Sequence, residues 1–145
     1  MRILALVIVM NFIQSLILIS IGGTIYVCME LAFRGRSHIS MFFCGGLCFW
    51  LIGLFNEGSV IFPLSIQAIL GAAVITTSEL LFGLVVNRWL HLGVWDYSAV
   101  PGNFLGQICL PFCAYWVLLS PLAALTDDAI RYIFFHEPWP PLVLF

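Results

Sequence analysis

Four long apolar stretches, separated by short polar segments, constrain this chain more than any other feature of its sequence. A helix of about 20 residues crosses the hydrocarbon core of a bilayer, and each stretch is close to that length or longer. Charged residues make up only 8% of the 145 residues, whereas a soluble domain carries about 25%. We therefore expect an all-α integral membrane protein, folded as a four-helix bundle in a single domain at 1-145.

Polar and turn-forming residues divide the chain into predicted segments. The apolar runs predict four membrane spans, at about residues 3-31, 39-55, 62-86 and 104-125. Between the last two spans, a run rich in turn-forming residues predicts a partly buried connection at 91-103. After the fourth span, Asp127 and Arg131 lie one helical turn apart and aromatic residues follow, so we expect an interfacial tail at 127-145 that begins with a short helix.

The first and third apolar stretches share an internal similarity. Gly22 and Glu30 align with Gly71 and Glu79 at a single offset. Because glutamate is rare in such stretches, the match predicts two repeated helix pairs that insert with the same orientation. The alternative is that the match between the two apolar segments is a coincidence.

The arginines give the orientation signal. Three of them, Arg34, Arg36 and Arg88, fall in connections on one side of the four-span arrangement, and Arg2 and Arg131 fall on the other. Connections rich in Lys and Arg stay in the cytoplasm. The segments expected in the cytoplasm are 34-38 and 87-103.

Glu30 and Glu79 are the most informative residues of the sequence. Each lies in the last turns of an apolar stretch, where a charged carboxylate costs about 2.5 to 3.5 kcal/mol by insertion scales. Such a residue is paired, protonated or exposed to a wet cavity. In the structural interpretation, each glutamate pairs with an arginine. In the functional interpretation, the two glutamates line a cavity.

Polar residues from both ends of the 87–103 connection are expected on the same membrane face as these two glutamates. They predict a polar vestibule that could bind a substrate, or else helix caps and hydrogen bonds between helices. The candidate residues are Glu30, Arg36, His38, Glu79, Asn87, Trp95, Asp96, Tyr97, Ser98, Asn103 and Gln107. No Glu-x-x-His pair occurs on either helix, so we expect no metal site and no cofactor, and no catalytic residue is assigned.

Four segments taken together resemble one known family. They are Gly35-Arg36-Ser37-His38-Ile39-Ser40-Met41, Glu79-Leu80-Leu81-Phe82-Gly83 with Asn87, Val94-Trp95-Asp96-Tyr97-Ser98, and Pro101-Gly102-Asn103-Phe104-Leu105-Gly106-Gln107-Ile108-Cys109-Leu110. The chain resembles the bacterial membrane family catalogued as "putative ABC-transporter type IV", or "putative ABC transporter permease". The resemblance implies a small multipass protein of the bacterial plasma membrane that takes part in transport.

The leading functional prediction is a permease-like membrane subunit rather than an enzyme. The sequence contains no Walker-type phosphate loop, so ATP would have to be bound by a separate subunit. Membrane lipids are expected partners, a homo-oligomer is left open, and nucleic acid is excluded because no basic face exists to hold phosphates. The alternatives are a membrane-embedded enzyme acting on a lipid or isoprenoid, and a non-catalytic regulatory subunit.

Overall fold

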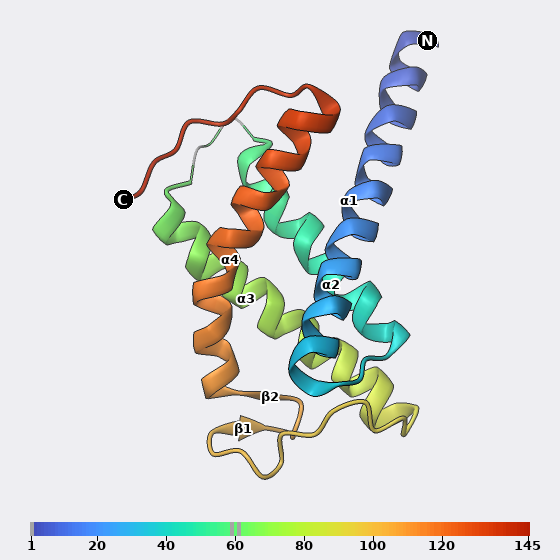
Figure 1. The fold of residues 1–145 in the computed structure, drawn as a ribbon, viewed down its shortest axis with the longest axis vertical. Coiled ribbons are helices and arrows are strands. Elements are labelled where there is room, and N and C mark those ends of the chain that lie inside the picture. The colour runs from blue at the N-terminus through green and yellow to red at the C-terminus, as the bar shows by residue number, and fades with distance from the viewer. Residues whose placement is uncertain (1, 59, 61) are drawn as a thin grey trace.

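The computed structural model describes residues 2–58, 60 and 62–145, with side chains from residue 8 onward. Within these residues the chain forms four long helices, as the sequence predicts (Figure 1). Their bounds are Arg2–Arg34 for α1, Ile39–Gly53 for α2, Leu64–Gly83 for α3 and Leu110–Ile130 for α4. All four are long and apolar enough to cross a membrane. The protein is therefore an α-helical membrane protein.

Shorter elements extend the helices and join them. A 3-10 turn at Leu54–Asn56 prolongs α2, and π-helical turns at Leu84–Trp89 and Arg131–Phe135 prolong α3 and α4. In the long connection before α4, strand β1 (Asn103–Phe104) pairs antiparallel with strand β2 (Ile108–Cys109). These elements put irregular backbone at the two ends of the bundle, where it can reach water or protein partners.

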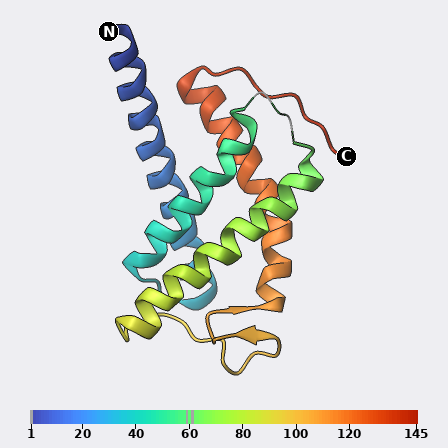
Figure 2. The same ribbon diagram turned by 180° about the vertical axis from the view of Figure 1, so that it is seen from behind.

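The helices form two successive antiparallel hairpins. α1 packs mainly on α2 and α3 mainly on α4, while α2 also contacts both helices of the second hairpin. Both chain ends lie toward the same end of the bundle, opposite the β1–β2 hairpin (Figures 1 and 2). The glycines aligned in the predicted repeat, Gly22 and Gly71, each pack against the helix that follows in the chain. The repeat itself stays a prediction.

Glycines allow α1 and α2 to approach each other very closely. Gly22 faces Phe49, and Gly45 of α2 faces Tyr26 in return, so that each glycine accepts an aromatic side chain from the other helix. Gly46 lies directly against the backbone carbonyl of Ile19. A methyl group at any of these glycines would overlap its neighbour. Close backbone contact of this kind is how membrane helices associate where lipid offers no hydrophobic driving force.

The fourth helix begins later than the sequence predicts. We expected a span at 104-125, but residues 103–109 form the β hairpin and α4 begins at Leu110. Gly102, Leu105 and Gly106 have positive φ angles of 72°, 55° and 70°, which a right-handed helix cannot contain. Pro111, in the first turn of α4, was the available signal for the true start.

The C-terminal segment also differs from the prediction. No break separates the expected short helix at Asp127 from α4, because the helix runs on through Ile130 into the π-helical turn. The remaining tail turns back toward α3. There the carbonyl oxygen of Val143 accepts a hydrogen bond from the Leu64 backbone N–H at 2.7 Å. The tail thus accepts hydrogen bonds from free backbone N–H groups at the start of α3. Pro63, immediately before them, has no backbone N–H that would need a partner.

Candidate functional site

The connection between α3 and α4 folds back over one end of the bundle as a lid, which we define as residues 90–109. Its anchor is Trp95, whose side chain is 4% exposed and packs with Met41 of α2 and Val86. The indole Nε1 of Trp95 donates a hydrogen bond to the Gln107 carbonyl oxygen at 2.9 Å. Gly83 leaves room for both, since a Cβ there would strike Gln107. The lid is therefore packed against the helices as part of the core.

Hydrogen bonds from Asn87 hold the two ends of the lid to α3. Its amide Nδ2 donates to Oε1 of Gln107 at 2.8 Å, and its Oδ1 accepts from the backbone N–H of Val94 at 2.7 Å. The π-helical turn that contains Asn87 changes the helical register at this point. Asn87 and Gln107, both predicted site residues, are thus partners of each other.

Glu30 is held by its own neighbours. It forms an ion pair with Arg34, one turn further along α1, and accepts a hydrogen bond from the Ser37 hydroxyl at 2.6 Å. Arg34 also donates to the Val94 carbonyl oxygen of the lid at 3.0 Å. The carboxylate therefore ties α1 to the lid. This arrangement matches the structural interpretation for Glu30.

The outer part of the lid is a polar turn. Oδ1 of Asp96 accepts hydrogen bonds from the Ser98 hydroxyl and from the Ser98 backbone N–H, and these bonds lower the pKa of the carboxyl. The Asn103 side chain bonds backbone groups at Ser98, Val100 and Gly106. Tyr97 stacks on Phe112 with ring centroids 4.9 Å apart, and burial raises its pKa. These side chains shape the turn.

Arg36 and His38 lie in the α1–α2 connection. His38 is the N-cap of α2, and its Nδ1 accepts from the Ser40 backbone N–H at 3.2 Å. Arg36 is exposed and forms no ion pair within the described part of the chain. Ten of the eleven candidate residues thus gather at the lidded end of the bundle, where they contact one another or neighbouring residues or are exposed.

Glu79 is the exception, because it lines a cavity in the middle of the bundle. Its side chain is 3% exposed, and Oε2 accepts a hydrogen bond from Nε1 of Trp116 at 2.9 Å. The other oxygen, Oε1, forms no hydrogen bond or ion pair with the described residues. Helix α3 contributes Ile75 beside it, one turn earlier.

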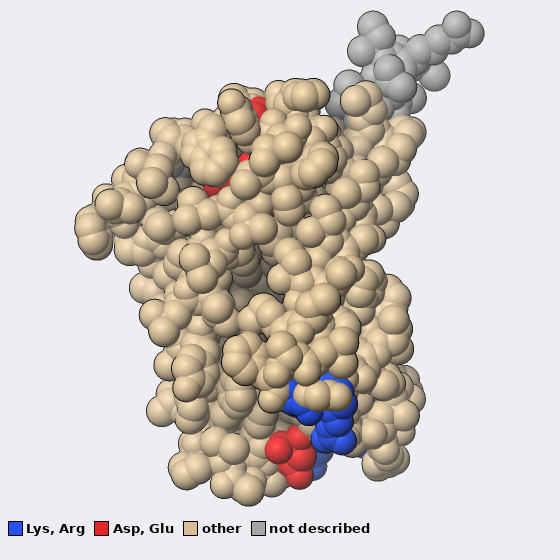
Figure 3. Space-filling view, viewed as in Figure 1, with Lys and Arg blue, Asp and Glu red and all other residues tan. Residues whose placement is uncertain are grey.

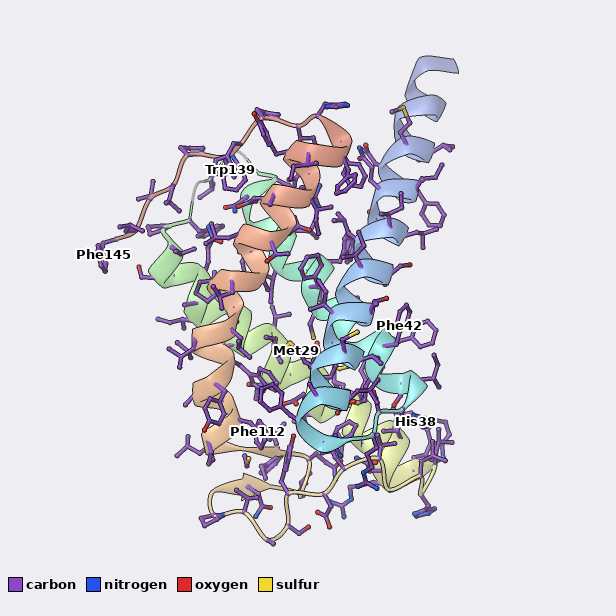
Figure 4. The ribbon with its side chains drawn as sticks, viewed as in Figure 1. Met29, His38, Phe42, Phe112, Trp139 and Phe145 are labelled. Carbon is purple, nitrogen blue, oxygen red and sulfur yellow. The ribbon has the colours of Figure 1, made fainter. Side chains whose placement is uncertain are left out.

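The cavity has a volume of about 220 Å³ and is a cleft open on one side. It is lined by Gly22, Ile25, Tyr26, Met29, Cys44, Gly45, Cys48, Phe49, Ile52, Ile75, Glu79, Trp116, Leu119, Leu122, Ala123 and Thr126. Ile25 of α1 and Leu122 of α4 flank its mouth and are 40% and 58% exposed. Figure 3 shows the hollow between α1 and α4 at mid-height, with no charged side chain visible at its rim, and Figure 4 places Met29 beside it. The cleft therefore opens sideways, between two helices that are long and apolar enough to cross a membrane.

A second polar cluster, which the sequence reasoning missed, lies at the opposite end of the bundle. Arg131 binds Asp127 at 2.6 Å, Glu57 at 3.3 Å and Glu137 at 3.4 Å. Asp127 is completely buried against Gly53. Burial raises the pKa of the Glu57 carboxyl, although the charge of Arg131 opposes that shift.

Amide side chains complete this cluster. Nδ2 of Asn56 donates to both oxygens of Asp128, at 2.9 and 3.1 Å, and Gln67 donates to Asn56 at 2.8 Å. No breaker residue interrupts the helical pattern between Pro121 and His136, which was the available signal that Asp127 and Asp128 belong to the fourth long helix. Among the described residues, no group of His, Cys, Asp and Glu is arranged to hold a metal ion.

Comparison with known proteins adds one assignment. No curated protein and no solved structure matches this chain. The sequence pattern of one protein family, described as "Putative ABC-transporter type IV", matches residues 3–131, which include all four helices and the lid. The chain therefore belongs to the "Putative ABC-transporter type IV" family and is an ABC-transporter-related membrane protein.

Proposed function

We propose that this chain is a permease-like membrane subunit that takes its substrate from the bilayer into the cleft around Glu79. The observation that carries the proposal is the cleft itself, a 220 Å³ cavity with apolar walls, one buried carboxylate and a mouth between α1 and α4. Ligand sites are concave and mostly apolar, with a few polar groups that fix orientation. The cleft has that composition.

The lidded end supports the proposal indirectly, because it offers little room for a substrate. Asn87, Gln107 and Trp95 bond one another, and Glu30 is neutralised by Arg34. A path for a substrate through this end would require those bonds to break. The sideways route between α1 and α4 requires no such rearrangement, since the exposed side chains of Ile25 and Leu122 border open space.

Membership of an ABC-transporter-related family supports a role in transport. Because the sequence carries no phosphate-binding loop, the energy source in this proposal is a separate ATP-binding subunit. The lipid-enzyme alternative has less support. Two carboxylates that share acid and base work need a common substrate space, and Glu79 is the one carboxylate of the described residues that lines the cleft.

The test is to fill the cleft and compare the molecules that the protein carries. Ala123→Phe places a ring in the cleft wall, and Leu118→Phe is the matched control, because Leu118 points outward and is 69% exposed. Each tagged variant is solubilised gently from its native membrane, and co-purifying proteins and small molecules are identified by mass spectrometry. We expect one class of small molecule to accompany the wild type and Leu118→Phe but not Ala123→Phe.

The same purification tests the transport context. Stoichiometric recovery of a subunit with its own nucleotide-binding sequence supports the permease role. A stable partner without one supports a regulatory subunit instead. Equal small-molecule content in the two phenylalanine variants would overturn the assignment of the cleft as the substrate site.

A further inference from the structure

The buried carboxylates of this protein differ in the groups that balance their charge. Glu30 has Arg34, Asp127 has Arg131, and Asp128 receives two hydrogen bonds from the amide of Asn56. Glu79 receives one hydrogen bond from an uncharged indole and has open space in front of it. Among the buried carboxylates of the described residues, it is the one that faces a cavity without a cation or a pair of donors.

Aromatic rings surround the same space. Tyr26 and Trp116 both line the cleft together with Glu79, and their ring centroids lie 6.4 Å apart with planes inclined at 41°. Phe49 lines it from α2. The faces of aromatic rings attract cations, and the attraction reaches about 2 kcal/mol or more when the cation is removed from water. A carboxylate and aromatic rings together are the chemistry that recognises an ammonium group.

The rest of the cleft is apolar and elongated. Trp116 and Thr126 line it ten residues apart on α4, which corresponds to about 15 Å along the helix. Between them Leu119, Leu122 and Ala123 form one wall. This length suits a hydrocarbon chain that leaves the carboxylate and passes out between the helices into the bilayer.

We propose that the ligand of the cleft is a cationic amphiphile, a molecule whose ammonium group lies beside Glu79 and against the rings of Tyr26 and Trp116, and whose hydrocarbon part lies along Leu119 and Leu122. This proposal rests on the proposed function and names its substrate class. An anionic headgroup would face Glu79 with no cation to balance it. The site thus selects by charge as well as by shape.

The test measures binding of three probes with the same chain length and different head charge. These are radiolabelled dodecyltrimethylammonium, dodecanol and dodecyl sulfate, each equilibrated by dialysis with the purified full-length protein in neutral maltoside micelles and with empty micelles. We expect saturable binding of the ammonium probe, at least about tenfold tighter than either of the others. This comparison on the wild-type protein requires no variant to fold.

Two variants then locate the effect. Glu79→Gln keeps an oxygen acceptor for Trp116 but removes the charge, and it should weaken binding of the ammonium probe by at least about tenfold. The matched control is Asp96→Asn, which removes one negative charge in the exposed turn of the lid, outside the cleft. It should leave the binding unchanged.

The outcomes separate this proposal from the broader one. If all three probes bind equally and Ala123→Phe abolishes their binding, the cleft is an uncharged site, and the cationic class is wrong while the proposed function stands. If dodecyl sulfate binds most tightly, the cationic class is also overturned. If no probe binds, the cationic class is overturned, and the co-purification test with Ala123→Phe and Leu118→Phe alone decides the proposed function.

Discussion

Glycine residues set how closely the helices approach one another, and Gly53 makes the most demanding contact. Its Cα lies against the carboxyl group of the completely buried Asp127, so that a Cβ would overlap all three carboxyl atoms. The carboxylate cannot move aside without losing its bond to Arg131. The buried polar cluster therefore requires glycine at position 53.

This contact predicts that Gly53→Ala destabilises the protein by about 1 to 3 kcal/mol, the usual cost of overpacking. Thermal unfolding in detergent, followed by loss of the monodisperse peak in size-exclusion chromatography, measures the effect. Gly58→Ala is the matched control, because the nearest atom to a Cβ there is 3.8 Å away. Equal stability of the two variants would show that the contact at Gly53 is not tight.

The ion pair between Arg131 and the buried Asp127 leads to a second prediction. Replacing one partner of a buried ion pair leaves the other charge uncompensated and costs about 3 to 5 kcal/mol. We therefore expect Arg131→Met to lower the free energy of unfolding by that amount, since Asp127 has no other cation beside it among the described residues. Arg36→Met, at an exposed and unpaired arginine, should change it little. Chemical denaturation of both variants measures the difference.

Among the elements of the fold, the lid shows how a connection with little regular structure beyond the β1–β2 hairpin can be rigid. Its backbone groups and side chains are satisfied by one another and by α3, and Trp95 inserts its ring between α2 and α3. Five residues of the lid with positive φ angles allow the chain to reverse direction twice in a short length. The lid is therefore expected to behave as part of the folded core.

Two tryptophans six residues apart test this expectation. Trp95→Ala removes a buried ring, which typically costs about 3 to 5 kcal/mol, and should greatly accelerate proteolysis within residues 90–109. Trp89→Ala, at a side chain that is 75% exposed, should leave the cleavage rate close to that of the wild type. Time courses of limited proteolysis analysed by mass spectrometry give both rates. A slow cleavage of Trp95→Ala would mean that the hydrogen bonds alone hold the lid.

The turn at Asp96 predicts a dependence on pH. The bonds from the Ser98 hydroxyl and backbone N–H lower the pKa of Asp96 in the folded state. Their contribution is therefore complete above the ordinary aspartate pKa of about 3.9 and is lost as pH falls through the lower folded value. Hydrogen exchange at the Ser98 amide, corrected for intrinsic rates, should accelerate over that range. In Asp96→Asn the acceleration should be absent.

The sequence predicts the number of helices of this molecule because an apolar run of span length has few other folds available. It predicts the start of α4 poorly, because Phe104 and Leu105 are apolar and extend the apolar run of the fourth span toward the N-terminus. In the structure, Leu105 and Gly106 have positive φ angles and cannot belong to a right-handed helix. Whether a residue adopts such an angle depends on contacts elsewhere. The position of the helix start therefore follows from tertiary structure.

The candidate site, too, is predicted from the sequence only in part. The sequence identifies Glu79 because its charge is expensive in a membrane, but it does not separate Glu79 from Glu30, whose environment differs. The cleft beside Glu79 arises from the distance between α1 and α4, which depends on how the glycines of α1 pack that helix on α2. No single helix carries that information in its own pattern.

For the whole molecule, the arginines of the α1–α2 connection and of the α3 end predict an orientation. We propose that the lidded end faces the cytoplasm and both chain ends face outward. Leu92→Cys in the lid should then react with a membrane-impermeant maleimide only after cells are permeabilised, whereas Phe145→Cys should react in intact cells. The wild-type chain, with its five native cysteines, gives the background. The reverse labelling pattern would invert the orientation.

The sideways opening of the cleft decides what competes for it. A pocket that opens to water competes with solvent, but a space between α1 and α4 at mid-height exchanges with lipid tails, which surround the protein at very high local concentration. Its occupancy then depends on the mole fraction of a ligand in the membrane rather than on its aqueous concentration. Extraction into detergent replaces that competitor with the detergent tail, so an affinity measured for the cleft is always an affinity relative to the amphiphile that was displaced.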